Sequence, residues 1–235
     1  MNQKVIEFHA ELRKAAAEGQ RHCYITRAKE FQIEAIEKLE EALKQAGALK
    51  AEFISDEDED SANAMLSFEK ILSAIVTELN MWVALKNDDP GAAWDFLANA
   101  EVSARSSLSV HPIGEQLNCE GYLRHLEILE HTLFPPLMFF SVGVIVDEAV
   151  CSICGQEYGE CDHIKGRAYM GQECVRIIKH ARMLEASVVD KPANKHARVT
   201  GMTDTEGVFR DILTWRAIPR HSPEPEPEQE QSIEG

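Results

Sequence analysis

Residues 151–163 read CSICGQEYGECDH, and a further cysteine follows at position 174. Four of the chain's six cysteines therefore lie close together beside a histidine. Two thiolates three residues apart can reach the same ion, and a tetrahedral Zn²⁺ site takes four Cys or His ligands with Zn–S bonds of about 2.3 Å. The stretch predicts a zinc site for which five side chains compete: Cys151, Cys154, Cys161, His163 and Cys174.

We expect these cysteines to be thiols and not disulfides. The N-terminus, MNQKV, has no apolar stretch typical of a signal peptide, and thiols stay reduced in the cytoplasm. Gly155 directly follows the second cysteine, where a glycine lets the backbone turn both thiolates inward. The interpretation is a cytoplasmic protein with Zn²⁺ as a structural cofactor, whose Cys23 and Cys119 are small core residues in helical stretches.

Charge and hydropathy restrict the partners that this chain can have. The net charge of the 235 residues is −16, and the acidic excess lies in residues 1–150 and in the last fifteen residues. Binding of nucleic acid over the whole surface is therefore disfavoured. The longest apolar stretch, residues 133–146, is too short to span a bilayer and contains two prolines, so no membrane partner is expected.

The periodicity predicts an α+β fold in three parts. Residues 1–132 carry apolar residues at helical spacing and predict an acidic all-α bundle; residues 133–218 predict a small zinc-binding, β-rich module; residues 219–235, rich in Pro and Glu, predict a disordered tail. Within the first part, we expect one helix to end near Gly47 and the central helix to span residues 61–86. The five acidic residues 56–60 predict a solvated loop.

Further helices and strands follow from local signals. Asp89 and Pro90 form an N-cap followed by proline, and a last helix begins near His111. Beyond the helices, the sequence predicts a buried strand over 137–146, a short helix over 174–182, strands over 168–170 and 184–189, a weaker strand over 197–200, and a turn at 192–194.

Two segments around the cysteines resemble a known family. Phe140–Gly143 resembles the "S-[IV]-G" strand of the tailed-phage prohead (capsid maturation) serine proteases, and residues 184–194, LEASVVDKPAN, resemble their "L-x-E-x-S-L-V-x-x-P-A-N" strand and turn. The cysteine pattern between them is similar to a zinc insert in some phage and prophage relatives. The resemblance covers roughly residues 137–200. It implies that Ser141 is the nucleophile and Glu185 the acidic member of a catalytic triad.

The family also has an upstream histidine base on a β-segment, whereas the histidines here lie in helical stretches: His111, His125 and His131. A serine nucleophile needs a base within hydrogen-bond reach. We therefore expect a protease-derived module that has lost its activity, with Ser141 as a small residue of a strand. Glu185 is then expected to form an ion pair with Arg182 or Lys191.

The leading interpretation is a non-enzymatic protein–protein interaction or assembly protein of phage or prophage type, with structural zinc. One alternative is an active serine endopeptidase that uses Ser141 and Glu185. A second is nucleic-acid binding through a basic face of residues 165–198, although Tyr169 is the only aromatic residue there for base stacking. The basic face consists of Lys165, Arg167, Arg176, Lys179, Arg182, Lys191, Lys195 and Arg198.

Overall fold

The protein has a mixed helical and strand architecture, as the sequence predicts. The computed structural model describes residues 2–219, in which the chain divides into two compact units, one up to Arg198 and one from Val199 onward. The first unit holds the helices and the cysteine-rich segment, and the second holds a small hairpin. The expected disordered tail falls almost entirely outside the described residues.

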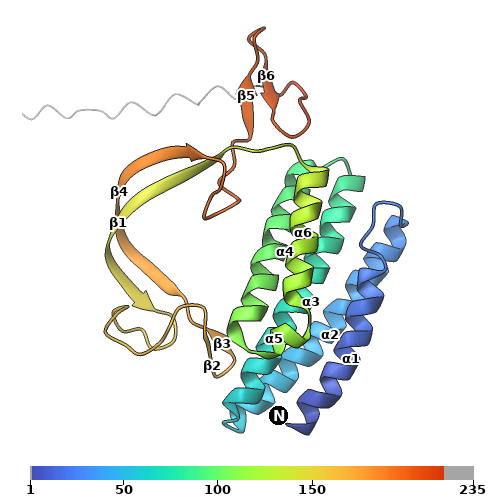
Figure 1. Ribbon diagram of the computed structural model, residues 1–235, viewed down its shortest axis with the longest axis vertical. Helices are drawn as coiled ribbons and strands as arrows, with labels where there is room; N and C mark the ends of the chain where they lie inside the picture. The colour runs from blue at the N-terminus through green and yellow to red at the C-terminus, as the bar shows by residue number, and fades with distance from the viewer. Residues whose placement is uncertain (1, 220–235) are drawn as a thin grey trace, which may run out of the picture. The chain divides into compact units, whose positions relative to one another are not determined.

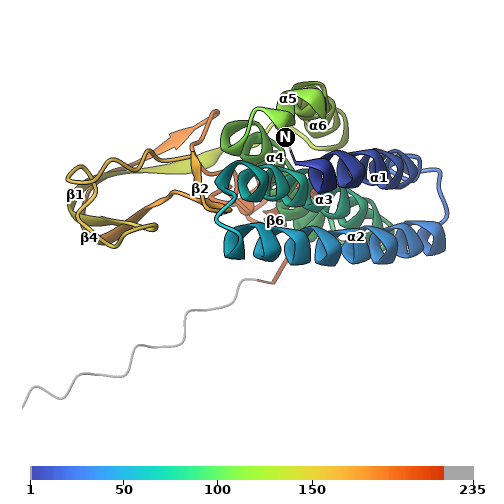
Figure 2. The ribbon, with the colours of Figure 1, turned by 90° about the horizontal axis from the view of Figure 1, so that it is seen from below.

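The helices of the first unit are arranged around α3. In chain order they are α1 (Gln3–Gln20), α2 (Lys29–Ser55), α3 (Glu59–Lys86), α4 (Pro90–Val110), α5 (Ile113–Gln116) and α6 (Cys119–Leu133) (Figure 1). Helix α3 packs against α1, α2 and α4, and Figure 2 shows it between α2 and α6. Its predicted apolar stripe is fully buried at Met65, Phe68, Leu72, Ile75 and Leu79. The central position of this helix follows from the width of that stripe.

Helix boundaries follow the predicted caps in part. Asp89 accepts a hydrogen bond from the backbone N–H of Ala92 at 2.9 Å, with Pro90 in the first turn, so the predicted start of α4 is confirmed. Helix α2 does not end near Gly47: it continues to Ser55, because burial of Phe53 outweighs the roughly 1 kcal/mol that one helical glycine costs. The acidic loop shortens to residues 56–58, since carboxylates favour the first turn of a helix and two of them begin α3.

A buried carboxylate joins α3 to α6. Glu78, which is 0% exposed, accepts hydrogen bonds from the Tyr122 hydroxyl at 2.6 Å, His125 Nε2 at 3.0 Å and Trp82 Nε1 at 3.4 Å. The hydrogen bond that His125 donates to Glu78 raises the pKa of His125, although partial burial of the ring opposes this shift. One of the three histidines considered as a base is therefore occupied by a contact within the bundle.

Two glycines of the bundle make a matched test of its packing. A Cβ at Gly114, in α5, would lie 2.5 Å from the backbone carbonyl oxygen of Ser107 in α4, which cannot move independently of its helix. We expect Gly114→Ala to lower the free energy of unfolding by about 2 kcal/mol. At Gly47 the nearest atom is the flexible Glu69 carboxylate at 3.3 Å, so Gly47→Ala should raise that energy by about 0.5 kcal/mol. Urea unfolding of both variants checks the pair, and equal losses would contradict the close approach of α5 to α4.

Two long strands form an antiparallel hairpin that leaves the helices, hereafter the β arm. It consists of β1 (Phe139–Cys151) and β4 (Arg176–Val189), with three irregularities in their register (Figure 1). Between them lie the short strands β2 (Ala168–Tyr169) and β3 (Gln172–Glu173). The helix predicted over 174–182 is wrong: this segment begins β4, because residues 176–183 pair with residues 144–151 of β1.

The strand predicted over 137–146 begins at Phe139, and apart from Leu137 and Phe139 this range is not buried. Phe140, Val142, Val144 and Ile145 are exposed, and every residue of β4 except Val189 is exposed. The apolar composition suggested burial, yet within residues 2–219 the arm has only two strands and no covering layer. The turn predicted at 192–194 forms slightly later, over residues 194–197, where the Asn194 carboxamide accepts a hydrogen bond from the His196 N–H at 3.0 Å.

The second unit is a short hairpin of β5 (Gly201–Thr203) and β6 (Phe209–Asp211). Its turn depends on Asp204, which accepts hydrogen bonds from the backbone N–H of Glu206 and of Val208, both at 2.9 Å. The weaker strand predicted over 197–200 is reduced to one bridge, from Arg198 to Phe139. Among the described residues, none of the helices combines the length and apolar character that crossing a membrane requires.

Candidate metal centre

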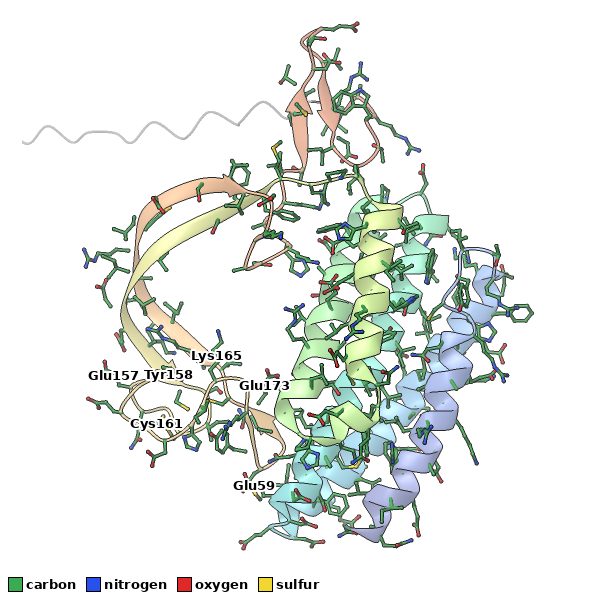
Figure 3. The ribbon with its side chains drawn as sticks, viewed as in Figure 1. Glu59, Glu157, Tyr158, Cys161, Lys165 and Glu173 are labelled. Atoms are coloured by element: carbon green, nitrogen blue, oxygen red, sulfur yellow. The ribbon has the colours of Figure 1, made fainter. Side chains whose placement is uncertain are left out.

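The end of β1 and the loop after it bring four metal-ligating side chains together. One ligand atom from each of Cys151, Cys154, Cys161 and His163 lies within 4.8 Å of the other three. Cys151 is the last residue of β1, and the other three come from the loop that Figure 3 shows around Cys161. Four of the five predicted ligands therefore form a group that could hold a metal ion.

The C-x2-C segment folds as a tight turn around the first sulfur. The Ile153 N–H donates to Cys151 Sγ at 3.4 Å, and the Gly155 N–H donates to the Cys151 carbonyl at 2.9 Å. Gly155 has φ +72°, which a side chain would disfavour, so the glycine is needed here as the sequence predicts. Backbone N–H groups pointing at a sulfur stabilise its thiolate form.

His163 has a ring nitrogen without a partner. Its Nδ1 is buried and makes no hydrogen bond, while the ring lies edge-on to Tyr169 with centroids 4.5 Å apart. Tyr169 is itself fixed, because its hydroxyl accepts the Ile164 N–H at 2.8 Å. A buried nitrogen with no hydrogen bond is costly, and coordination of an ion would satisfy it. The histidine therefore fits the ligand role.

Cys174 lies beside this group. Its thiol is buried, and its Sγ is 3.8 Å from Cys151 Sγ. Backbone hydrogen bonds from the Gly166 N–H to the Cys174 carbonyl and from the Cys174 N–H to the Arg167 carbonyl, both 2.8 Å, hold it there. Cys174 is thus near enough to Cys151 to compete with His163 for the fourth coordination position.

The thiols influence one another as a crowded set of potential anions. Burial opposes ionisation of Cys151, but the backbone N–H groups of Cys154 and Ile153 and the thiols of Cys174 and Cys161 lower its pKa to about 6. Burial and the neighbouring Cys151 raise the pKa of Cys174 to about 11. Sulfurs this close resist joint ionisation unless a cation compensates their charge. A set of sulfur and nitrogen donors suits Zn²⁺ and not Mg²⁺ or Ca²⁺, which prefer oxygen.

Residues that the sequence did not single out support the loop. The Ser152 hydroxyl accepts the Val175 N–H at 2.9 Å and closes the end of the β arm, and the Tyr158 hydroxyl accepts the Lys165 N–H at 3.2 Å. Tyr158, Lys165 and Cys161 are marked in Figure 3. In the sequence, the only signal for this supporting role is that Tyr158 and Tyr169 lie between cysteines of the cluster. Hydrogen bonds between a hydroxyl and the backbone depend on how the loop folds, so the sequence does not reveal them.

Side chains of the bundle hold the segment after the loop. The Asn63 carboxamide accepts the Gly171 N–H at 2.8 Å and donates to the Ala168 carbonyl at 3.3 Å. Glu173, labelled in Figure 3, accepts a hydrogen bond from Ser106 at 2.6 Å and pairs with Lys70 at 3.1 Å. The candidate metal centre therefore lies where the β arm joins helices α3 and α4.

The implied catalytic residues lie in the β arm without a base. Ser141 pairs with Ser187 and Glu185 pairs with Gly143 in the strand register. Within residues 2–219, neither side chain makes a hydrogen bond to a histidine, and the expected ion pair of Glu185 does not form. Arg182 instead binds both oxygens of Asp147 at 3.0 Å. Within these residues, Ser141 therefore has no hydrogen-bonded histidine of the kind that activates a serine nucleophile in a triad.

The predicted basic face is partly neutralised by local contacts. Arg182 is paired with Asp147, and Lys195 is paired with Glu101 at 2.6 Å and with Glu130. These pairs remove two of its eight cations from a continuous basic surface, which weakens the case for nucleic acid.

Comparisons with known proteins assign no family to the chain. No protein-family model matches it, and no curated protein and no solved structure matches it. The likeness of residues 137–200 to phage proteases therefore remains a resemblance of motifs.

Proposed function

We propose that this chain binds one structural Zn²⁺ ion through Cys151, Cys154, Cys161 and His163, and acts as a protein–protein interaction or assembly protein. The observation that carries the proposal is that four sulfur and nitrogen ligand atoms lie within 4.8 Å of one another, where β1 of the exposed β arm ends at Cys151. A set of reduced thiols for this purpose fits the cytoplasm.

The proposed ion is structural and not catalytic. Zinc enzymes leave one coordination position for water or substrate, whereas four protein ligands fill the tetrahedral shell. The ligands come from the end of β1 and the following loop, so an ion would join the strand to a loop with little apolar core of its own. Metal binding then contributes to the folding of this segment.

The assembly role is supported by the exposure of the β arm and by the motif resemblance. A two-stranded hairpin is marginally stable alone in water, and this one presents apolar side chains on a long exposed surface. Large exposed apolar surfaces mark sites of protein contact. The likeness to prohead proteases suggests tailed-phage or prophage assembly as the context, with the hydrolytic function lost.

Cobalt substitution tests the ligand set. We expect one Co²⁺ per chain, with thiolate-to-metal charge-transfer bands and the intense visible bands of a tetrahedral ion. His163→Ala should weaken metal binding by at least tenfold and alter these bands, because it removes the nitrogen ligand. Cys174→Ala, the matched variant at the competing position, should leave the bands nearly unchanged. If the Cys174 variant loses metal binding and the His163 variant retains it, the fourth ligand is the Cys174 thiolate and not His163.

A further inference from the structure

The β arm exposes large apolar side chains along both strands. Met183 is 70% exposed and Leu184 is 66% exposed, and seven further apolar residues are also exposed: Phe140, Val142, Val144, Ile145, Ile177, Ile178 and Val188. Val144 and Ile145 are consecutive in β1 with no register shift between them, so their side chains point to opposite faces of the arm. Exposure of both faces is unusual, because a sheet ordinarily buries at least one of them. The arm therefore lacks a covering partner within residues 2–219.

The outer edge of β1 is open only in its middle. At one end, the Phe140 N–H donates to the Ala197 carbonyl at 2.7 Å; at the other, the Tyr158 N–H donates to the Ala149 carbonyl at 2.8 Å. Between these points, residues 141–148 make no further backbone hydrogen bond on that edge within the described chain. Both ends of the edge are thus capped by the protein's own loops, and one segment is left for another strand.

The outer edge of β4 is open as well. In the described part of the chain, residues 176–189 make backbone hydrogen bonds only with β1. Each arm consequently offers two unpaired edges, and unpaired edges are templates for strand addition.

The two strands have opposite charge. Strand β1 carries two acidic residues, Asp147 and Glu148, and no Lys or Arg. Strand β4 carries three basic residues, Arg176, Lys179 and Arg182, against one acidic residue. Lys179 makes no ion pair within residues 2–219. Arg182 already pairs with Asp147 within the arm. Pairing β1 with a second β1, or β4 with a second β4, would bring strands of like net charge together, whereas pairing β1 with β4 brings strands of opposite net charge together.

We propose that the partner of the β arm is a second copy of this chain, and that the open segment of β1 pairs antiparallel with β4 of the next copy. This inference rests on the proposed assembly function and names its partner. Hairpins that point the same way alternate in strand direction, so the contact repeats the pairing already present within one arm. Because the two contacting edges differ, the contact is heterologous and builds a ring or an open series of copies.

The repeated register makes a specific cross-copy pair. Within the arm, Glu148 lies opposite His180, the neighbour of Lys179. The same register between copies places Glu148 of one copy opposite His180 of the next and close to its neighbour Lys179. It also aligns apolar residues such as Val144 and Met183 into rows across the continuous sheet.

The test measures the mass of the full-length, zinc-loaded protein by light scattering and sedimentation over a range of concentrations. We expect species larger than a dimer. Lys179→Glu should weaken association by about fivefold per contact, and Glu148→Lys combined with Lys179→Glu should restore it, because the charges are exchanged. Leu184→Ser should weaken it by about tenfold through lost apolar contact.

Matched variants in the helices serve as controls. Lys14→Glu makes the same charge change in α1, and Ile128→Ser makes a similar polar change at a side chain of α6 that is 63% exposed. Both should associate like the unchanged protein. Equal weakening by arm and control variants would overturn the assignment to the β arm.

Three other results would overturn the proposal. A monomer at all concentrations would exclude self-association, and a dimer that does not grow would indicate a two-fold contact instead. Stronger association of Lys179→Glu would indicate β4-to-β4 pairing, since the change would remove repulsion between like charges. Zinc content and helical circular dichroism of the same samples separate this failure from failure of the proposed function: a zinc-loaded, folded monomer removes only the second copy as partner.

Discussion

Replacing Cys154 by serine is expected to abolish stoichiometric zinc binding and to loosen the loop and the adjacent end of the β arm. Cys154 is one of the four side chains of the proposed zinc site, and binding of structural zinc in small sites contributes on the order of 10 kcal/mol or more. Helices α1 to α4 bury their own apolar core, so their far-UV circular dichroism should be nearly unchanged. The direct measurement is the zinc content of the purified variant, together with hydrogen exchange of residues 151–175.

Cys23→Ala is the matched control for this variant. Cys23 is a buried thiol, whereas Cys154 is exposed; Cys23 lies between α1 and α2, and burial strongly raises its pKa. The Cys23→Ala variant should retain one zinc per chain. Full zinc content in Cys154→Ser would contradict the ligand assignment, and loss of the helical signal would show that the helices need the metal centre to fold.

Lys195→Met is expected to lower the free energy of unfolding by about 3 kcal/mol near pH 8, because it leaves a buried carboxylate without its cation. Lys195 follows β4 and pairs with Glu101 at 2.6 Å and with Glu130 on the bundle. Glu101 is only 4% exposed, and its Oε1 makes no hydrogen bond. Lys191→Met, at an exposed lysine four residues earlier, is the control and should change stability little.

The loss caused by Lys195→Met should depend on pH in a defined direction. In the unchanged protein, burial raises the pKa of Glu101 and the contact with Lys195 opposes that rise. Without Lys195 the folded chain holds the Glu101 proton more tightly than the unfolded chain, whose pKa is about 4.3. Stability then falls as the pH rises from that value through the raised folded pKa. Chemical unfolding at pH 5 and pH 8 should give the smaller loss at pH 5; a larger loss at pH 5 would contradict this account.

Local sequence signals predicted the helices well because their determinants are local. The apolar stripe of α3 and the Asp89–Pro90 start of α4 are encoded within a few residues. The continuation of α2 past Gly47 depends on tertiary burial of Phe53, which periodicity near the glycine does not reveal. The break between α5 and α6 depends on Asn118, whose backbone is left-handed with φ 55°.

The group of candidate metal ligands was also predictable, since the spacing of Cys151 and Cys154 limits where their thiols can point. Choosing the fourth ligand was not, because it depends on the loop that buries His163 against Tyr169 and brings Cys174 beside Cys151. The same limit applies to the β arm. An apolar strand that is covered inside a sheet and an apolar strand that is exposed have similar composition, and only the folded structure distinguishes them.

Elemental analysis of the natively purified, unchelated protein tests the central claim most directly. The account predicts one zinc ion per chain that survives dialysis and is released when the thiols are modified. Protein that is folded by circular dichroism, has all six cysteines reduced, and yet contains no stoichiometric metal would contradict it.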